Sequence, residues 1–502
     1  MQKSLLLIVS IVCFINPYVF SQKSDAEISG KRYKRIVVRG ATVVDGNGTP
    51  ATGPKDIVIE NDKILRIVGL NPVAVKAGTA RRPPKGDVEI DAAGKFVIPG
   101  LINAHGHTHE GRGGIPMEVE YCQKLWLASG QTTIRELAAP SKALKWREQS
   151  EKNEIAAPRM FVYTTFPGAS SQEQARQRVR EIKQKGFDGI KLFAVDRDIM
   201  AALMDEAKKQ GLRVAHHTGV AETNTWDDIK FGTTSIEHWY GIPEAAIANG
   251  RQNYPSDYNY SDEVDRFRYA GRLWREADWD RLMKVFDAMI AAGVAWDPTL
   301  NIYEASRDLQ KAQTDPAYKD YLHPTLEKFF IPNPANHGSY FIGWTSTDEA
   351  YWKENYRIWM KALVEFERRG GLIGAGEDAG FIYKMYGFGL LRELELHQEA
   401  GFHPLMVIKH ATGNNAKILG VEDRIGRIRV GYKADLLVVN GNPLEDLKVL
   451  YPTGTETIVD GKVVKTGGIE WTIKDGIPFH APTLAKEVRE IVAGARRNLR
   501  AQ

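Results

Sequence analysis

The sequence predicts an α/β protein whose main domain is a (β/α)8 TIM-like barrel, joined to a small β domain made from both chain ends. Three observations predict this fold class. Short apolar strands alternate with longer helical patterns between residues 98 and 423. The flanking stretches, 35–97 and 424–466, show short β patterns without helices between them. Polar side chains follow several of the predicted barrel strands, where such a barrel holds its active site.

Length and charge set broad limits on function. The 502 residues are enough for one large domain and a smaller one. The net charge of +4 is small against 67 basic and 63 acidic residues. No basic tract with interleaved aromatic residues is present, so the sequence indicates no nucleic-acid partner. The expected partner is a small-molecule substrate.

The first residues have the pattern of a secretory signal. Lys3 supplies a positive end, residues 4–15 form a short apolar run, and a cleavage site follows Ser21. Residues 1–21 are therefore predicted to be a signal peptide, and the mature protein to be periplasmic or secreted. The alternative is an uncleaved anchor, but the run is short for a membrane span, so no stable membrane insertion is expected. The mature chain keeps only Cys122, which excludes an intrachain disulfide.

The N-terminal β region begins at Arg35. Residues 36–40 and 41–48 read as strands, the second ending in a Gly- and Asn-rich turn, and residues 56–68 read as a hairpin. An apolar run then leads through Pro99 and Gly100 to His105 and His107. Successive side chains of a strand alternate between its faces, so the two histidines point the same way. Taken alone, this pair of histidines is about as compatible with a polar strand end as with a metal site.

Seven further strands follow the histidine pair. With the first they make eight, the number that closes the barrel. Amphipathic helices are expected between them, for example at 172–185 and 199–210. The predicted strands are 132–137, 160–165, 189–193, 213–217, 234–239, 294–300 and 372–377.

Two connections are too long for simple crossovers. They are residues 240–279 and 302–354, and because loops after barrel strands lie on the active-site face, both are expected to cover the pocket. Their aromatic residues could contact substrate or could simply pack the insertions onto the barrel, which is the more common role. These residues are Tyr254, Tyr258, Tyr260, Trp274 and Trp279.

The remainder of the chain returns to β patterns. A helix is predicted at 404–418, followed by strands at 426–428, 434–440 and 456–464. Residues 467–502 are predicted to be a C-terminal tail ending in a basic amphipathic helix at 482–499. A solvated surface helix is the default interpretation of that pattern, with membrane contact as a weaker alternative.

Polar residues gather at the carboxyl ends of the predicted strands. Each is weak evidence alone: a lysine can lie at the surface with its stem buried, a histidine can be a hydrogen-bonded core residue, and an aspartate can cap a helix. His216 and His217 are adjacent, so at most one can face a given site. Their common placement nevertheless predicts a metal site. The set is His105, His107, Lys191, His216 or His217, His238 and Asp378.

The motifs as a set resemble the amidohydrolase superfamily, within it the metal-dependent hydrolases related to Xaa-Pro dipeptidases and imidazolonepropionases. The resemblance covers about residues 35–466. It rests on Pro-Gly-Leu-Ile-Asn-Ala-His-Gly-His at 99–107, Gly-Ile-Lys at 189–191, the His216 strand, Ser-Ile-Glu-His at 235–238, Gly-Glu-Asp at 376–378, and the stretches 411–420 and 431–439.

The resemblance implies a distorted (β/α)8 barrel over residues 98–423 and a composite β-sandwich from 35–97 and 424–466. It implies that His105, His107 and Asp378 hold the more buried metal. The same resemblance implies that His216 and His238 hold a second metal, with His217 outside the ligand set. Lys191 would be carboxylated and bridge the two, and without carboxylation a one-metal site stays open. Two positions depart from the family pattern, Asn103 and Glu377.

These expectations lead to a metal-dependent hydrolase of a C–N bond, acting on a small substrate such as a dipeptide or an N-acyl amino acid. Metal-activated hydroxide would attack the carbonyl, with Asp378 as general base and acid. Zinc is the expected metal, one or two ions per chain, although the ligand types also suit manganese, cobalt or iron. Arg135 and Lys384 are candidates to bind a substrate carboxylate.

Two alternatives stay open. The first keeps the metal site but changes the bond to a lactone or a cyclic amide. The second is a secreted binding protein on an inactive hydrolase scaffold. A dinucleotide-dependent dehydrogenase is not supported, since no Gly-rich phosphate loop follows a strand. A homo-oligomer is compatible with the sequence.

Overall fold

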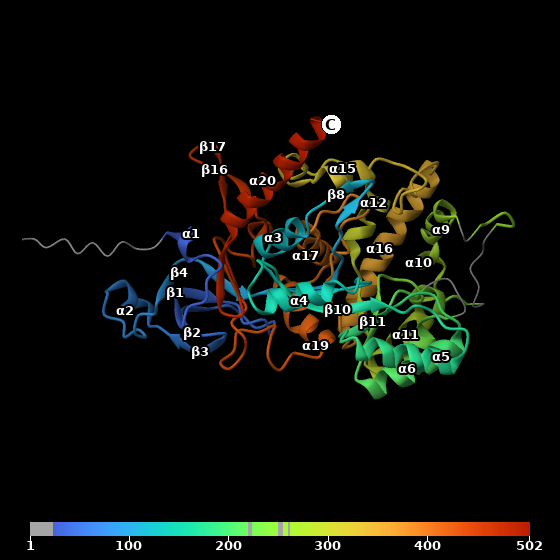
Figure 1. Ribbon diagram of the computed structural model, residues 1–502, viewed down its shortest axis with the longest axis horizontal. Coiled ribbons are helices and arrows are strands. Elements are labelled where there is room, and N and C mark those ends of the chain that lie inside the picture. The colour runs from blue at the N-terminus through green and yellow to red at the C-terminus, as the bar shows by residue number, and fades with distance from the viewer. Residues whose placement is uncertain (1–23, 219–222, 249–254, 260–261, 502) are drawn as a thin grey trace, which may run out of the picture.

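A computed structural model describes residues 24–218, 223–248, 255–259 and 262–501. The predicted signal peptide, 1–21, lies outside these residues. Figure 1 shows a blue β region at one end of the molecule, and helices surrounding the barrel beside it. No helix of the described chain is long and apolar enough to span a bilayer.

The barrel contains seven strands that pair in parallel, in the spatial order β14-β13-β12-β11-β10-β9-β6. Most of their residues are buried, because helices cover the outer face, as expected of a parallel sheet. The strands are β6 (Leu101–Gly106), β9 (Gln131–Glu136), β10 (Arg159–Thr165), β11 (Gly189–Leu192), β12 (Arg213–His216), β13 (Ser235–Glu237) and β14 (Ala295–Asp297).

Helices connect these strands as the alternating pattern predicts. Most end at a glycine or begin at a capping side chain; for example, α6 ends at Gly211 with φ 64°, a conformation that glycine adopts without strain. The connecting helices are α3 (Val119–Ala128), α4 (Ala143–Glu151), α5 (Gln172–Gln184), α6 (Arg197–Gln210), α7 (Thr225–Phe231), α11 (Trp279–Ala292), α16 (Ser346–Arg368) and α17 (Phe388–Ala400).

Residues 372–378 close the barrel as an irregular eighth segment. On one side, Trp296 N donates to Leu372 O at 2.9 Å and Gly374 N to Trp296 O at 2.8 Å. On the other, Ala104 N donates to Ala375 O at 3.1 Å and Asp378 N to His105 O at 2.8 Å. Seven of the eight predicted strands are therefore regular, the eighth holds its place by backbone bonds to both neighbours, and the TIM-like barrel is confirmed.

The β region is a mixed sheet of eight strands drawn from both chain ends. Its order is β19-β18-β15-β5-β1-β2-β3, with β4 also paired to β1. The structure confirms that both ends contribute to one sheet, whereas a sandwich of two facing sheets is not confirmed. The strands are β1 (Arg35–Val43), β2 (Thr52–Glu60), β3 (Lys63–Gly69), β4 (Val88–Asp91), β5 (Phe96–Pro99), β15 (Leu436–Val439), β18 (Ile469–Lys474) and β19 (Ile477–His480).

Two boundaries differ from the prediction. Strands β18 and β19 fall inside the predicted tail, 467–502, but β18 pairs with β15, and β19 with β18, in the large sheet. Strands β16 (Thr455–Val459) and β17 (Lys462–Thr466) fall inside the predicted β domain, yet they form a two-stranded sheet of their own. Strand pairing over long sequence distances decides these boundaries, and a local pattern does not reveal it.

The apolar run before the histidine pair is divided between the two domains. Strand β5 pairs with β15 in the large sheet, and β6 pairs with β9 in the barrel. The chain passes from one to the other at Gly100, where any side chain would collide with Thr132. The histidines therefore lie on a barrel strand that continues directly from the sheet.

Both predicted insertions are mainly helical. Their large aromatic side chains build the core, for example Trp274, whose ring centroid is 5.9 Å from that of Trp296. The first contains α8 (Ile242–Ala245), α9 (Glu263–Ala270) and α10 (Leu273–Glu276). The second follows η1 (Leu300–Tyr303) and contains α12 (Glu304–Arg307), α13 (Leu309–Gln313), α14 (Tyr318–Tyr321), α15 (Pro324–Phe329) and the start of α16.

The C-terminal region confirms two predicted helices. The stretch predicted as 404–418 is α18 (Pro404–Lys409), the π-helical turn η2 (His410–Asn414) and α19 (Asn415–Leu419). The predicted amphipathic helix is α20 (Ala481–Arg500), which buries Leu484, Val488 and Val492 against the core and packs on α3. Short elements complete the fold: α1 (Asp25–Ile28), α2 (Pro72–Lys76), β7 (Gly111–Arg112), β8 (Ile115–Pro116) and η3 (Leu447–Leu450).

Candidate metal centre

A cavity of about 480 Å³ lies at the carboxyl ends of the barrel strands. Five of the six residues in the predicted ligand set line it, together with side chains from both insertions. The polar and charged lining residues are His105, His107, Thr108, His109, Glu136, Lys191, His217, Thr218, His238, Arg266, His337 and Asp378.

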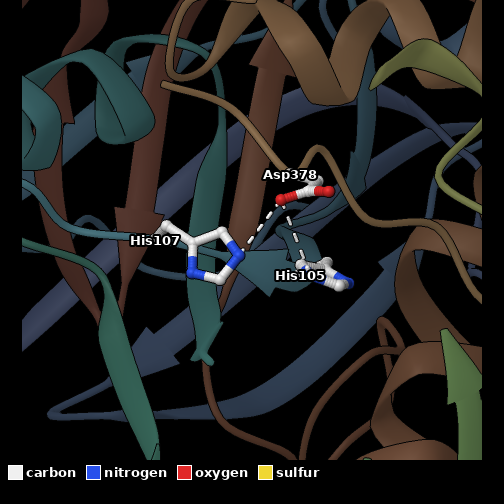
Figure 2. Close-up of side chains that lie close together, drawn as sticks. All are labelled: His105, His107 and Asp378. Carbon is white, nitrogen blue, oxygen red and sulfur yellow. Dashed lines mark ion pairs between the residues drawn. The ribbon is translucent and has the colours of Figure 1, made fainter. Parts of the chain in front are cut away.

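His105, His107 and Asp378 form the centre of this cavity (Figure 2). The Nε2 atoms of His105 and His107 lie 3.7 Å and 3.0 Å from Asp378 Oδ1. Their Nδ1 atoms face away from it, toward Glu237 Oε2 at 2.7 Å and the Leu137 carbonyl at 2.8 Å. A histidine that donates its other ring N–H to an oxygen is oriented for metal binding.

His238 approaches the same carboxylate from β13. Its Nε2 lies 3.8 Å from Asp378 Oδ2, and its Nδ1 lies 2.5 Å from the Thr299 hydroxyl. His238 and Asp378 both have a left-handed backbone, with φ of 64° and 45°. A left-handed backbone is uncommon for residues other than glycine, although histidine and aspartate adopt it more readily than most, and it often occurs at functional sites.

Lys191 is the unusual cation of the site. It is 1% exposed, and its Nζ has no hydrogen-bond partner among the described residues. Burial lowers the pKa of Lys191 to about 8, although the nearby Glu237 and Asp378 carboxylates act to raise it. A buried amine with no partner and a lowered pKa is suited to carboxylation or to a ligand that the protein alone does not supply.

The structure places the two adjacent histidines on opposite sides of β12. In the parallel pairing of β11 with β12, Lys191 is level with Ala215 and Leu192 with His216. Because faces alternate, His216 points outward with Leu192, and its Nδ1 lies 2.6 Å from Asp228 Oδ1 on α7. His217 points inward with Lys191 and lines the cavity. Its ring centroid is 4.6 Å from that of His238, so His217, and not the predicted His216, is the histidine of this pair that lies beside the other candidate ligands.

A buried ionic cluster lies beneath the histidines. The Arg135 guanidinium donates to Glu237 Oε1 at 2.8 Å, to Asp297 Oδ2 at 3.2 Å and to the Ser235 hydroxyl at 2.8 Å. Arg135 is fully buried, so the prediction that it binds a substrate carboxylate is wrong. The cluster positions His105 through Glu237. Glu237 belongs to the Ser-Ile-Glu-His motif, so that motif was the feature of the sequence that could have predicted this contact.

The other predicted carboxylate-binding residue is also engaged elsewhere. Lys384 Nζ donates to Glu304 Oε2 at 2.8 Å, and Lys384 does not line the cavity. His109 lines the cavity, but the Tyr386 hydroxyl meets its Nδ1 at 2.5 Å and Arg112 meets its Nε2. With both nitrogens occupied, His109 is not a candidate ligand.

The two departures from the family pattern have structural partners. The Asn103 side-chain oxygen accepts from His105 N at 3.0 Å and from Glu377 N at 3.2 Å. Glu377 is fully buried beside Trp126 and accepts from Gly387 N at 2.9 Å. Burial raises the pKa of Glu377 to about 7. Since Glu377 does not line the cavity, it adds no charge to the pocket wall.

Both insertions contribute to the pocket wall, as the sequence predicts. Arg266 and Phe267 come from the first, and Tyr303 and His337 from the second. The aromatic residues named from the sequence are not the ones used: Tyr258, Trp274 and Trp279 do not line the cavity, and Tyr254 and Tyr260 lie outside the described residues. Phe267 and Tyr303 were missed because aromatic residues in a helical insertion carry no signal that separates pocket from core.

The donor set fits divalent metal. Three histidine Nε2 atoms point at one aspartate, a fourth histidine and an unpartnered lysine lie beside them, and ligand atoms of His105, His107 and Asp378 all lie within 4.8 Å of one another. Imidazole nitrogen with carboxylate oxygen suits zinc, and also manganese, cobalt or iron. Burial lowers the pKa of His105 to about 4, which keeps this imidazole neutral and able to act as a ligand.

The chain is similar to known hydrolases in sequence. The amidohydrolase family model matches residues 362–464. Dihydropyrimidinase of Rattus norvegicus is 25% identical over 180 residues, 33% of this chain and 31% of that protein. Ochratoxinase of Aspergillus niger is 39% identical over 75 residues, 14% of this chain and 16% of that protein. The matches thus span less than a third of the length of either relative.

Solved structures show the same fold over most of the chain. A Xaa-Pro dipeptidase with methionine bound in its active site aligns with a TM-score of 0.62 at 20% identity, covering 89% of this chain and 100% of that one. A. niger ochratoxinase aligns with a TM-score of 0.60 at 17% identity, covering 90% and 97%. These structures show the fold that the motifs predict, and the sequence match to the amidohydrolase family over residues 362–464 supports the resemblance to that superfamily.

Proposed function

We propose that this chain, with its amidohydrolase-like barrel, is a metal-dependent hydrolase that cleaves a C–N bond of a small substrate such as a dipeptide or an N-acyl amino acid. One observation carries the proposal: the Nε2 atoms of His105, His107 and His238 converge on Asp378 beside an unpartnered, buried Lys191. This arrangement lies in a cavity at the carboxyl ends of barrel strands, where such barrels perform catalysis.

The ligands divide into two groups. His105, His107 and Asp378 would hold one divalent ion, and His217 with His238 a second. Lys191, carboxylated on Nζ, would lie between them. Zinc is the proposed metal, with one or two ions per chain. When bound, the metal polarises the scissile carbonyl and lowers the pKa of the attacking water.

Asp378 is the proposed general base and acid. Burial alone would raise its pKa, but the polar groups around it, among them the His107 Nε2 at 3.0 Å, hold the pKa of Asp378 well below its ordinary value. The carboxylate is therefore ionised at neutral pH and can accept a proton from the attacking water. It can then deliver that proton to the leaving nitrogen, which would otherwise depart as an unstable amide anion.

The pocket wall favours an apolar group on the substrate. Phe193, Phe267, Ile302 and Phe381 line the cavity around the polar centre. A volume of about 480 Å³ is in the range of small-molecule sites. Dipeptides and N-acyl amino acids are supported by the fold shared with a Xaa-Pro dipeptidase. The match to dihydropyrimidinase keeps a cyclic amide, and with it a lactone, as the second candidate.

The cellular location of the protein is also a proposal. Residues 1–21 have the composition of a signal peptide with cleavage after Ser21, which supports a periplasmic or secreted protein. Its partners would be a small-molecule substrate and further copies of the chain, without nucleic acid.

The test is hydrolysis by residues 22–502, reconstituted with zinc, across Xaa-Pro dipeptides, N-acyl amino acids, cyclic amides and lactones. Asp378→Asn should lower kcat for the accepted class by about 10²–10⁴-fold. Asp278→Asn is the matched control, because Asp278 caps α11 and asparagine caps equally well. Turnover of lactones alone would remove the C–N assignment, and zinc binding without turnover of any class would favour the binding-protein alternative.

A further inference from the structure

The hairpin of β16 and β17 presents apolar side chains to solvent. It forms a two-stranded sheet apart from the eight-stranded one, and Figure 1 shows it at the margin of the molecule. Ile458 and Val463 are 73% and 68% exposed. A two-stranded hairpin is marginally stable alone, so further packing on its open face would stabilise it.

The strand register places the apolar and charged residues on one face. Glu456 pairs with Lys465, and Ile458 pairs with Val463. Since faces alternate, these four side chains share one face, which we call the hairpin face. All four residues of the hairpin face are exposed, whereas the opposite face is covered in part: Thr455 and Val464 are half-buried there, although Thr457 and Val459 are exposed.

The charges of the hairpin face have no ion-pair partner in the part of the chain that the structure describes. Neither Glu456 nor Lys465 makes an ion pair with any residue that the structure describes, although they are cross-strand neighbours. A partner that complements this face would place a cation above Glu456, an anion above Lys465 and apolar groups above Ile458 and Val463.

A second copy of the same face meets this requirement. A two-fold axis that runs parallel to the strands, midway between them, places each β16 above the β17 of the other copy. Glu456 then faces Lys465 of the partner subunit, and Ile458 faces the partner's Val463. We propose that the hairpin face is a self-complementary, two-fold interface between two copies of this chain.

The experiment measures mass in solution by analytical ultracentrifugation of residues 22–502 over micromolar concentrations. Glu456→Lys and Lys465→Glu each place like charges opposite one another across the axis. Each variant alone should shift the mass from two chains to one. A mixture of the two variants restores opposite charges across the axis, so it should return to two chains.

The mixing step separates the proposal from misfolding, because two misfolded variants would not restore each other. Val73→Lys is the control: Val73 is 76% exposed on α2, away from the hairpin, and the mass should not change. The proposal is overturned if the unaltered protein is one chain throughout, if the single variants keep the mass of the unaltered protein, or if the mixture stays at one chain.

Discussion

Lys191 and Lys474 are both buried lysines, but their amines differ in their hydrogen-bond partners. Both have a pKa lowered by burial to about 8. Lys474 Nζ donates to Ser150 O at 2.8 Å, to Ser150 Oγ at 3.0 Å and to Ala157 O at 3.2 Å, whereas Lys191 Nζ has no partner among the described residues. Only the partnerless amine is free to react with carbon dioxide.

This difference predicts which lysine is carboxylated. In the zinc-reconstituted protein supplied with ¹³C-bicarbonate, a carbamate resonance should appear in the carbon NMR spectrum. Lys191→Ala should abolish the resonance and lower the bound metal per chain, because a bridging ligand is lost. Lys474→Met is the matched control and should retain both. Persistence of the signal in Lys191→Ala would refute the assignment.

The histidine pair at 216–217 gives a second prediction at this scale. His217→Asn should lower the metal bound per chain and reduce kcat/KM by at least about 100-fold, because a cavity-facing ligand is removed. His216→Asn should retain the metal but lower the free energy of unfolding by about 1–3 kcal/mol, because it disturbs the buried contact to Asp228. Metal analysis and urea unfolding measure the two effects, and the reverse pattern would restore His216 as the ligand.

The placement of a single residue was predictable where the strand periodicity or a sequence motif determined it. His105 and His107 are two residues apart in a strand pattern, so their side chains were expected to point the same way. The other candidate ligands follow strand ends, so they were expected at the same end of the barrel. The choice between His216 and His217 depends on how β12 aligns with β11, and that alignment places Ala215 beside Lys191. Register arises from pairing between strands, so one strand's own sequence cannot decide it.

At the scale of elements, a buried acid joins the second insertion to the barrel. Glu304, on α12, accepts from Lys384 at 2.8 Å and from Arg392 on α17 at 2.6 Å, and it is 2% exposed. Burial alone would raise its pKa, but Lys384 and Arg392 hold the pKa of Glu304 well below its ordinary value. Tyr303 and Ile302, immediately before Glu304, line the cavity.

Glu304→Gln should lower the free energy of unfolding by about 3–5 kcal/mol at neutral pH, because it leaves buried cations unpaired. Because its folded pKa is depressed, the contribution of Glu304 is fully present above about pH 4.5 and is lost as pH falls below that value. The variant should therefore lose less stability on acidification than the unaltered protein, measured by urea unfolding at pH 7 and pH 4.

The control for this prediction is Glu399→Gln. Glu399 also pairs with an arginine, Arg307 at 2.6 Å, but its side chain is 46% exposed. An exposed pair contributes less than about 1 kcal/mol, so this variant should change stability little. Equal effects of the two substitutions would show that burial of Glu304 is not what matters.

Most elements were predictable to within a few residues because apolar patterns of period 2 and 3.6 are local. The exceptions depend on tertiary contacts. The run at 96–107 carries the predicted domain boundary between residues 97 and 98, whereas the structure divides it at Gly100, between β5 and β6. Residues 372–377 read as a strand but bend, since the chain must turn there to aim Asp378. Neither the division at Gly100 nor this bend alters the local pattern of apolar and polar residues.

For the whole molecule, the barrel was predictable from the count and alternation of its strands, and the shared sheet from the β patterns at both ends. The limits of that sheet were not. Trp471 on β18 pairs with Val438 on β15, while the hairpin that precedes β18 stays apart. The sequence of β16 and β17 is as β-like as that of β18, and only the completed packing distinguishes an inner strand from an exposed hairpin.

The pairing of β5 with β15 also sets an order of events during synthesis. Val97 meets Val438, so the edge of β5 that faces β15 has no partner until more than three hundred further residues have left the ribosome. At about 5–20 residues per second this delay is on the order of tens of seconds. A newly made chain therefore carries an open β edge beside the histidine strand for that time, and a chaperone that shields such edges would raise the yield of correctly folded protein.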